Sequence, residues 1–174
     1  MLRSWPTQAL IPSFHIDFLS QLNAEIRIRA ATAVDVPAIM AIERQSSNAG
    51  HWSEDQYTQM FSENSRRLVL IVESSSTGFI VGFLVAHQVA AEWELENVAV
   101  SMDHRRHGIA EKLLRELIAT ATKMAGTSIF LEVRESNTAA RRLYEKIGFR
   151  RMGVRKSYYQ NALEDAILYR LHLR

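Results

Sequence analysis

Apolar and polar residues follow two different periods along this chain from residue 26 onward. Alternation with a period of two, or a short apolar run bounded by turn residues, predicts strands. These segments are 26–31, 67–74, 79–89, 92–100, 128–134, 149–158 and 165–173. Apolar residues spaced by three and four predict helices over about 32–42, 53–61, 109–124 and 138–147. The order β-α-α-β-β-β-α-β-α-β-β predicts a mixed sheet with helices, an α/β domain.

Several residues at the expected boundaries support this assignment. Thr32 with Asp35, and Ser53 with Gln56, have the spacing of a capping box at a helix start. The tetrapeptide "SSTG" predicts a hairpin turn between the second and third strands. Gly148 is placed to end the last helix in the left-handed conformation. The local turn and cap residues therefore agree with the periodicity.

The length and composition favour one folded domain. The chain has 174 residues, of which 47% are hydrophobic. We assign a single domain to 26–174 and an N-terminal extension of unknown role to 1–25. No apolar run reaches the roughly 20 residues that span a bilayer, and the first residues show no signal-peptide pattern. We therefore expect a cytoplasmic protein without a membrane partner.

Cysteine, histidine and charge narrow the possible chemistry. The chain has no cysteine, which excludes disulfides and thiolate nucleophiles. Only His104 and His107 lie close together, so we expect no metal site. Residues 101–160 hold 13 Lys and Arg against 6 Asp and Glu, whereas the remainder holds 8 against 13. This cationic half indicates either ordinary solvated helix faces or a polyanionic ligand. Aromatic residues are sparse in it, so we expect a phosphorylated cofactor rather than nucleic acid.

The sequence Arg105-Arg106-His107-Gly108-Ile109-Ala110 joins an apolar strand to a helix. Unpaired backbone N–H groups at a helix start bind anions, and small residues allow phosphate oxygens to approach them. The segment is neither a Walker loop nor a GxGxxG turn. Taken alone, R-x-x-G-x-A also fits many solvated helix starts.

The stretch "NVAVSMDHRRHGIAEKLL" resembles the acetyl-CoA signature of the GNAT superfamily of N-acetyltransferases. The stretches "FLEVRESNTAARRLYEKIGF", "RKSYY" and "EDAILYRL" resemble, more narrowly, the RimI-like ribosomal-protein alanine N-acetyltransferases. The resemblance covers nearly the whole chain after its first 25 residues. It implies the GNAT fold, with helices on both faces of a mixed central sheet. It also implies direct acetyl transfer from acetyl-CoA, without a metal, to a protein N-terminal α-amine.

The same resemblance implies roles for individual residues. It makes Glu132 the general base and Tyr144 the donor to the leaving thiolate. The cofactor residues that it implies are Val98, Ala99, Val100, Arg105, Arg106, His107, Gly108, Ile109, Ala110, Glu111 and Asn137. The acceptor residues that it implies are Trp52, Tyr158, Tyr159, Glu164 and Asp165. The partners that it implies are acetyl-CoA and a protein or peptide N-terminus, such as that of a ribosomal protein.

Three departures from the family pattern concern the acceptor more than the cofactor. Arg105 stands where glutamine is common, which leaves the backbone cradle intact. His51 stands in "SNAGHWS" where the RimI-like enzymes have proline, and the hairpin "YYQNALEDA" is shortened. Both of the latter lie where the family grips its acceptor. Other acceptors, namely a lysine side chain, a polyamine or a small amine, therefore stay open, as does a non-catalytic acyl-CoA sensor.

The chemistry suits a modest base. An α-amine with a pKa of about 7.7–8.0 costs about 1 kcal/mol to deprotonate at pH 7, against about 4.6 kcal/mol for lysine. From the residues alone, Glu132 is better interpreted as a carboxylate at a strand end that pairs with Arg134 or another cation; the resemblance favours the base. Glu94, and then Glu96, are alternative bases on the preceding strand. Judged from the residues alone, Tyr144 is a packing residue. If it faces the leaving thiolate, its phenol would stabilise that thiolate by a hydrogen bond more readily than protonate it.

Overall fold

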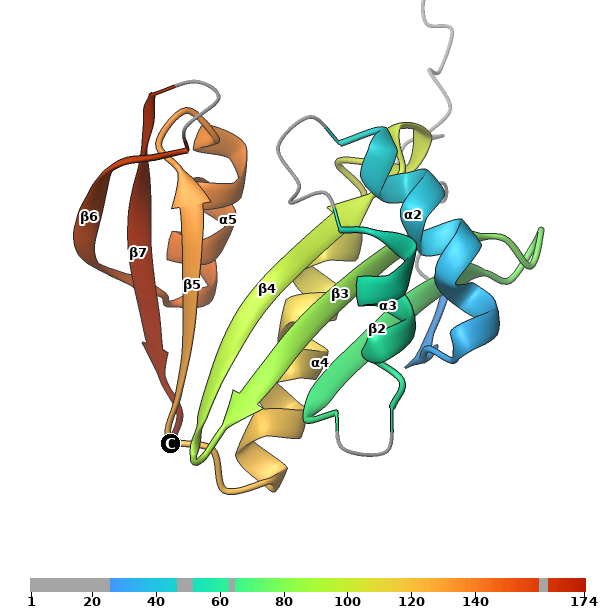
Figure 1. Cartoon of the computed structure of the whole chain (residues 1–174), viewed down its shortest axis with the longest axis horizontal. Coiled ribbons are helices and arrows are strands. Elements are labelled where there is room, and N and C mark those ends of the chain that lie inside the picture. The colour runs from blue at the N-terminus through green and yellow to red at the C-terminus, as the bar shows by residue number, and fades with distance from the viewer. Residues whose placement is uncertain (1–25, 47–51, 63–64, 160–162) are drawn as a thin grey trace, which may run out of the picture.

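The computed structural model describes residues 26–46, 52–62, 65–159 and 163–174 (Figure 1). The predictions for 1–25, for His51 and for the hairpin turn at 160–162 lie outside these residues. The strands are β1 (Ile26–Ala30), β2 (Arg67–Ser74), β3 (Ile80–Val89), β4 (Glu92–Val100), β5 (Ser128–Arg134), β6 (Arg150–Tyr159) and β7 (Glu164–His172). The helices are α2 (Val36–Arg44), α3 (Glu54–Gln59), α4 (Ile109–Lys123) and α5 (Thr138–Ile147), with 3₁₀ turns η1 (Ala33–Asp35) and η2 (Met102–His104). The predicted order of elements is confirmed.

The seven strands form one mixed sheet in the order β1-β2-β3-β4-β5-β7-β6. Only β4 and β5 pair in parallel; every other pair is antiparallel. The parallel pairing runs from Glu92 opposite Ser128 to Leu95 opposite Leu131 and then stops. Figure 1 shows β4 and β5 diverging beyond this point. The sheet is therefore split at the carboxyl ends of its two parallel strands.

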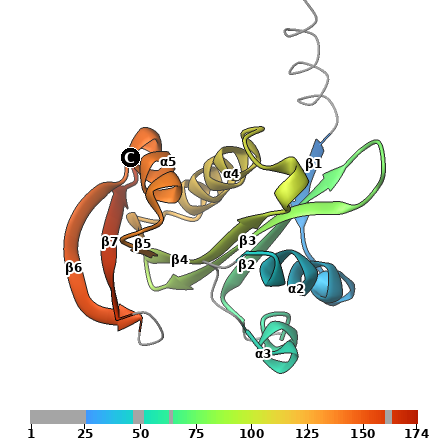
Figure 2. The same ribbon diagram turned by 90° about the horizontal axis from the view of Figure 1, so that it is seen from above.

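Helices cover both faces of the sheet, as predicted (Figure 2). Helices α2 and α3 pack on one face in an apolar cluster that includes Ile39, Tyr57 and Phe83. Helices α4 and α5 pack on the other face in a larger cluster that includes Leu114 and Tyr144. Among the described elements, none covers β5, β7 and β6 on the α2–α3 side. That side of the last three strands is therefore a helix-free surface, which we call the open face.

The predicted caps are present where they decide element boundaries. The Thr32 amide donates to Asp35 Oδ2 at 2.8 Å, and Ser53 and Gln56 exchange amide-to-side-chain bonds of 2.8 and 3.3 Å. Gly148 ends α5 with φ of 113°, a left-handed conformation that is unfavourable for residues other than glycine. No helix in the described part of the chain is long and apolar enough to cross a membrane.

A bulge in β4 lies just before the split. Val85 of β3 is opposite Asn97, and Ala86 is opposite Leu95, so Glu96 has no partner of its own. A bulge changes which face neighbouring side chains occupy and often lies beside an active site. Here it places Asn97 in the core under α2, whereas strict alternation does not predict this.

Candidate active site

The split between β4 and β5 is bordered by main chain from Glu96 onward that has no strand partner on the β5 side. Val98, Ala99 and Val100 lie on this unpaired edge, and the last two are buried. Because backbone N–H and C=O groups there lack a ladder partner, they are available to an extended ligand with amide groups. The predicted pantetheine-binding residues therefore lie where such a ligand can bind.

The turn that follows η2 leaves an array of backbone donors at the start of α4. Gly108 caps the helix with φ of 77° and Arg106 has φ of 67°, so the turn requires two left-handed residues. The Lys112 N–H donates to the Gly108 carbonyl at 3.0 Å. The amides of Ile109 to Glu111 precede that bond and are the unsatisfied donors of the first turn. A Cβ on Gly108 would meet no protein atom within 4 Å, so space for an anion lies beside this turn.

The side chains of this turn are less available than its backbone. Arg105 donates through Nε to the Val100 carbonyl at 3.0 Å and through Nη2 to Ser46 Oγ at 3.2 Å. Arg105 thus ties the end of β4 to the segment after α2, so the guanidinium of this predicted cofactor residue is already engaged. The Glu111 carboxylate accepts hydrogen bonds from Lys146 and Arg115, and these bonds lower its pKa. Because the carboxylate is engaged in this way, the backbone amide is the part of Glu111 that faces the turn.

Close packing holds the turn against the sheet. A Cβ on Gly82 of β3 would lie 3.2 Å from Ile109 Cγ2 and 3.2 Å from the Ala99 carbonyl oxygen. Glycine at this position therefore allows the first turn of α4 to contact β3 directly. Ile109 is buried at 3% exposure beside Val100 in the same cluster. The anion-binding donors are fixed relative to β4 by this contact.

Glu132 lies on β5 beyond the end of its pairing with β4. Its neighbours Leu131 and Val133 face the core under α4 and α5, so its carboxylate is on the open face and 25% exposed. Arg155 Nη1 of β6 donates to Glu132 Oε1 at 2.6 Å. The expectation of a cationic partner is confirmed, but the partner is Arg155 rather than Arg134. Glu132 is therefore a solvent-accessible carboxylate held at the split by one exposed arginine.

Tyr144 lies on α5, on the face of the sheet that α4 also covers. Its ring is 6% exposed and packs against Phe149 and Tyr169 at centroid distances of 5.8 and 6.2 Å. Burial raises the pKa of its phenol, so the hydroxyl stays protonated. Among the described residues, none is hydrogen-bonded to this hydroxyl, which leaves it available to a ligand. Asn137, at the start of the same helix, accepts from the Ala140 amide at 3.2 Å and keeps its amide hydrogens for another acceptor.

The predicted acceptor residues of the last hairpin lie close to Glu132. The charge of Glu132, together with burial, raises the pKa of Tyr158, whose ring lies 4.5 Å from the Arg155 guanidinium carbon. Tyr159 packs under Arg134, with 3.9 Å between the guanidinium carbon and the ring centroid. The hairpin and the end of β5 thus place two aromatic rings and two guanidinium groups together.

The two acidic residues of that hairpin are already engaged. Glu164 accepts from Arg134 at 3.3 Å and from the Ser136 amide at 2.7 Å. Asp165 accepts from Lys156 at 2.5 Å and from the Ser157 amide at 2.9 Å. These bonds shape the hairpin, and they compete with direct attraction of a cationic acceptor.

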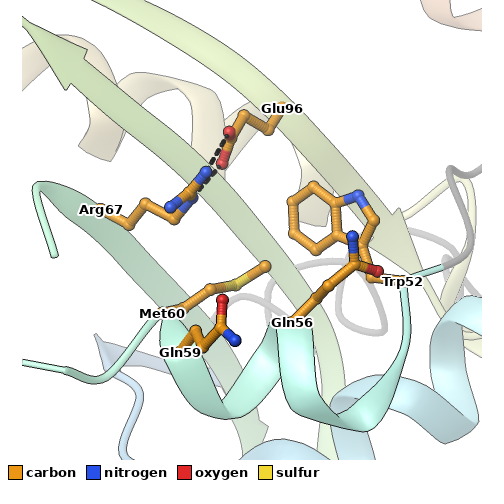
Figure 3. A pocket seen from close by; sticks show the side chains of 6 residues that line it. All are labelled: Trp52, Gln56, Gln59, Met60, Arg67 and Glu96. Carbon is orange, nitrogen blue, oxygen red and sulfur yellow. Dashed lines mark hydrogen bonds and ion pairs between the residues drawn. The ribbon is translucent and has the colours of Figure 1, made fainter.

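Trp52 lies just before α3, beside a pocket of about 200 Å³ (Figure 3). The other lining residues are Gln56, Gln59, Met60, Arg67 and Glu96. Arg67 binds Glu96 through two bonds of 2.7 and 2.9 Å, so Glu96 is poorly placed to act as a base. Glu94 is exposed on the same face of β4 and stays the alternative to Glu132.

One buried carboxylate near this pocket was not predicted. Glu43 on α2 is 2% exposed and accepts bonds from α3, from β4 and from the segment before α3. A signal was present, because Glu43 follows Ile39 by four residues on the apolar side of the helix. Among the described residues, no cluster of three His, Asp or Glu side chains is arranged to hold a metal.

The split sheet, the donor-rich helix start and the carboxylate on β5 define an acyl-CoA-type transferase site. The family model for the acetyltransferase (GNAT) family matches residues 36–149. The chain belongs to this family of N-acetyltransferases, which use acetyl-CoA as donor.

Comparison with individual proteins narrows the family to relatives with a named acceptor. The chain is 35% identical over 143 residues to the [ribosomal protein bS18]-alanine N-acetyltransferase of Escherichia coli K12, covering 81% of this chain and 93% of the relative. It is 27% identical over 147 residues to a putative enzyme of the same name from Bacillus subtilis, covering 84% and 95%. The crystal structure of the ribosomal-protein-S18-alanine N-acetyltransferase from Escherichia coli superposes with a TM-score of 0.77 at 33% identity, covering 85% and 94%. The predicted family and fold are confirmed.

Proposed function

We propose that this N-acetyltransferase acetylates the α-amine of a protein N-terminus, and that a ribosomal protein beginning with alanine is its acceptor. The observation that carries the proposal is the position of Glu132, an accessible carboxylate at the split of β4 and β5, with an aromatic hairpin beside it. The relative named for bS18 alanine acetylation, 35% identical over most of both chains, supports this acceptor.

The residues of the split fit acetyl-CoA, which supplies an activated acetyl thioester when bound. Val98 to Val100 would bind the pantetheine amides through their unpaired backbone edge. The amides of Ile109 to Glu111 would bind the pyrophosphate, with Gly108 leaving the approach open. A helix start contributes only about 0.3–1 kcal/mol toward an anion, and micromolar affinity needs about 8 kcal/mol, so both segments are required.

Glu132 would remove the proton from the attacking amine, either directly or through a water molecule. A carboxylate is sufficient for an α-amine, because deprotonation at pH 7 costs about 1 kcal/mol. It is poorly matched to lysine, for which the cost is about 4.6 kcal/mol. Arg155 must share or release the carboxylate during this step. Since exposed ion pairs contribute about 0–1 kcal/mol, the pair with Arg155 is easily broken.

Tyr144 would donate a hydrogen bond to the sulfur as negative charge develops there. Burial raises the pKa of the phenol, which makes full proton transfer to a thiolate more unfavourable. A fixed donor in a site with little water stabilises charge without having to reorganise. Tyr144 therefore acts as an electrostatic stabiliser, with solvent supplying the proton afterwards.

A kinetic comparison of acceptors tests the proposal. Thiol release from acetyl-CoA would be measured with an alanine-starting ribosomal peptide, the same peptide with a blocked N-terminus, free lysine and spermidine. We expect rapid release with the first peptide alone. Comparable kcat/KM for the blocked peptide or spermidine would favour a side-chain or polyamine acceptor. Acetyl-CoA binding without thiol release from any amine would instead indicate a sensor.

A further inference from the structure

Glu43 is a buried carboxylate whose partners in the described structure are neutral donors. Its Oε1 accepts from the Tyr57 hydroxyl at 2.7 Å and from Asn97 Nδ2 at 2.9 Å, and its Oε2 accepts from the Trp52 amide at 3.4 Å. Among the described residues, none forms an ion pair with it. Burial of a carboxylate is unfavourable unless donors replace its hydration, so these bonds stabilise it in place.

The three partners come from parts of the chain that are far apart in sequence. Tyr57 belongs to α3, Trp52 precedes that helix, and Asn97 belongs to β4. Asn97 is the first residue after the bulge at Glu96 and immediately precedes the predicted pantetheine edge. One carboxylate on α2 thereby links the pocket wall that Trp52 forms, which we call the Trp52 wall, to the strand that borders the split.

The bonds of Glu43 fix the position of the Trp52 ring relative to β4. The Trp52 ring packs on Tyr57 at a centroid distance of 5.4 Å and lines the pocket that Arg67 and Glu96 border (Figure 3). If Glu43 lost its bonds, Tyr57 and Trp52 would lose their shared anchor to β4. The pocket wall would then shift relative to β4, whereas the first turn of α4, packed through Gly82 on β3, would not. Displacement of an acceptor by about 1 Å lowers transfer rates strongly.

We propose that Glu43 is a positioning residue for the acceptor. It holds the Trp52 wall at a fixed distance from β4, so that an amine bound on the open face meets the split. The proposal rests on the proposed function, because it takes the open face as the acceptor site. It assigns Glu43 no contact with acetyl-CoA and no proton transfer.

The test compares Glu43→Gln with Tyr57→Phe, which removes one of the three donors. Glu116→Gln is the matched control, since Glu116 is an exposed carboxylate on α4. Steady-state kinetics with the alanine-starting peptide would give KM and kcat, and calorimetry would give the Kd of acetyl-CoA. We expect Glu43→Gln to raise the peptide KM about tenfold and Tyr57→Phe to raise it about threefold. The Kd of acetyl-CoA should stay within twofold, and the control should match the wild type.

The outcomes separate the two proposals. A Glu43→Gln protein with unchanged peptide KM, or with peptide KM and acetyl-CoA Kd raised together, overturns the positioning role. If that variant does not fold, Tyr57→Phe decides by the same criteria. A wild-type enzyme that acetylates the peptide while Tyr57→Phe behaves normally contradicts the positioning role alone. A wild-type enzyme that acetylates no free N-terminus contradicts the proposed function, and the positioning role with it.

Discussion

Replacing Tyr144 by phenylalanine removes one hydroxyl and leaves the ring where it packs. Because no described residue bonds that hydroxyl, we expect the free energy of unfolding to change by less than about 0.5 kcal/mol. A hydrogen bond to a charged group contributes about 1.5–3 kcal/mol, and 1.4 kcal/mol corresponds to a factor of ten. The account therefore predicts a fall in kcat of about ten- to a hundredfold, with little change in the Kd of acetyl-CoA.

Tyr169 offers a matched control, because it is buried beside Tyr144 but its hydroxyl is engaged. It donates to the Glu145 carboxylate, so its replacement by phenylalanine should lower stability by about 1.5–3 kcal/mol and leave kcat within about twofold. The assay is thiol release at saturating concentrations of both substrates, with urea unfolding on the same preparations. An unchanged kcat for Tyr144→Phe where chemistry limits the rate, or equal losses in both variants, would refute the reasoning.

Three further predictions concern the general base Glu132, the turn at Gly108 and the ion pair between Arg29 and Asp35. Glu132→Gln should lower kcat/KM for the peptide by about 10²–10⁴-fold at pH 7, a deficit that narrows toward pH 9 as the α-amine deprotonates; a constant deficit in a pH series would argue against proton removal. Gly108→Ala should weaken acetyl-CoA binding severalfold in calorimetry, because φ of 77° costs other residues about 1–2 kcal/mol; an unchanged Kd would show that this turn does not hold the cofactor. The bonds from Arg29 lower the pKa of Asp35 to about 2, so its stabilisation of about 2 kcal/mol is complete above about pH 5 and is lost as pH falls to 2. The urea midpoints of Asp35→Asn and the wild type should therefore converge as the pH falls over that range. A difference between the two midpoints that stays unchanged down to pH 2 would contradict this direction of the pH dependence.

The periodicity of the chain was enough to predict every strand and α-helix of the described residues, but not the 3₁₀ turns η1 and η2. Alternation and helical spacing depend on which face of an element is buried, and that is a local property of the sequence. Gly148 and the capping boxes fixed the boundaries for the same reason. The split between β4 and β5 does not follow from this periodicity, since strand pairing depends on contacts between distant segments.

The partners of the site residues were harder to predict. Arg155 is 23 residues from Glu132 and reaches it only because β6 lies beyond β7 in the sheet. Asn97 faces α2 rather than α4 because of a bulge, which shifts the alternation by one residue without changing composition. Arg105 was expected to contact the cofactor, but its Nε donates to the Val100 carbonyl, which the fold brings close to it. Side-chain pairing of this kind follows from register, which the local pattern does not contain.

The most direct test uses one peptide that offers both kinds of amine. The peptide would begin with a free alanine and carry an internal lysine, and it would be incubated with acetyl-CoA and the wild-type protein. Tandem mass spectrometry would then locate the acetyl group. The account predicts one acetyl group on the α-nitrogen, lost with Glu132→Gln at pH 7 and unaffected by Glu116→Gln. Acetylation at the lysine in preference to the α-nitrogen would contradict it.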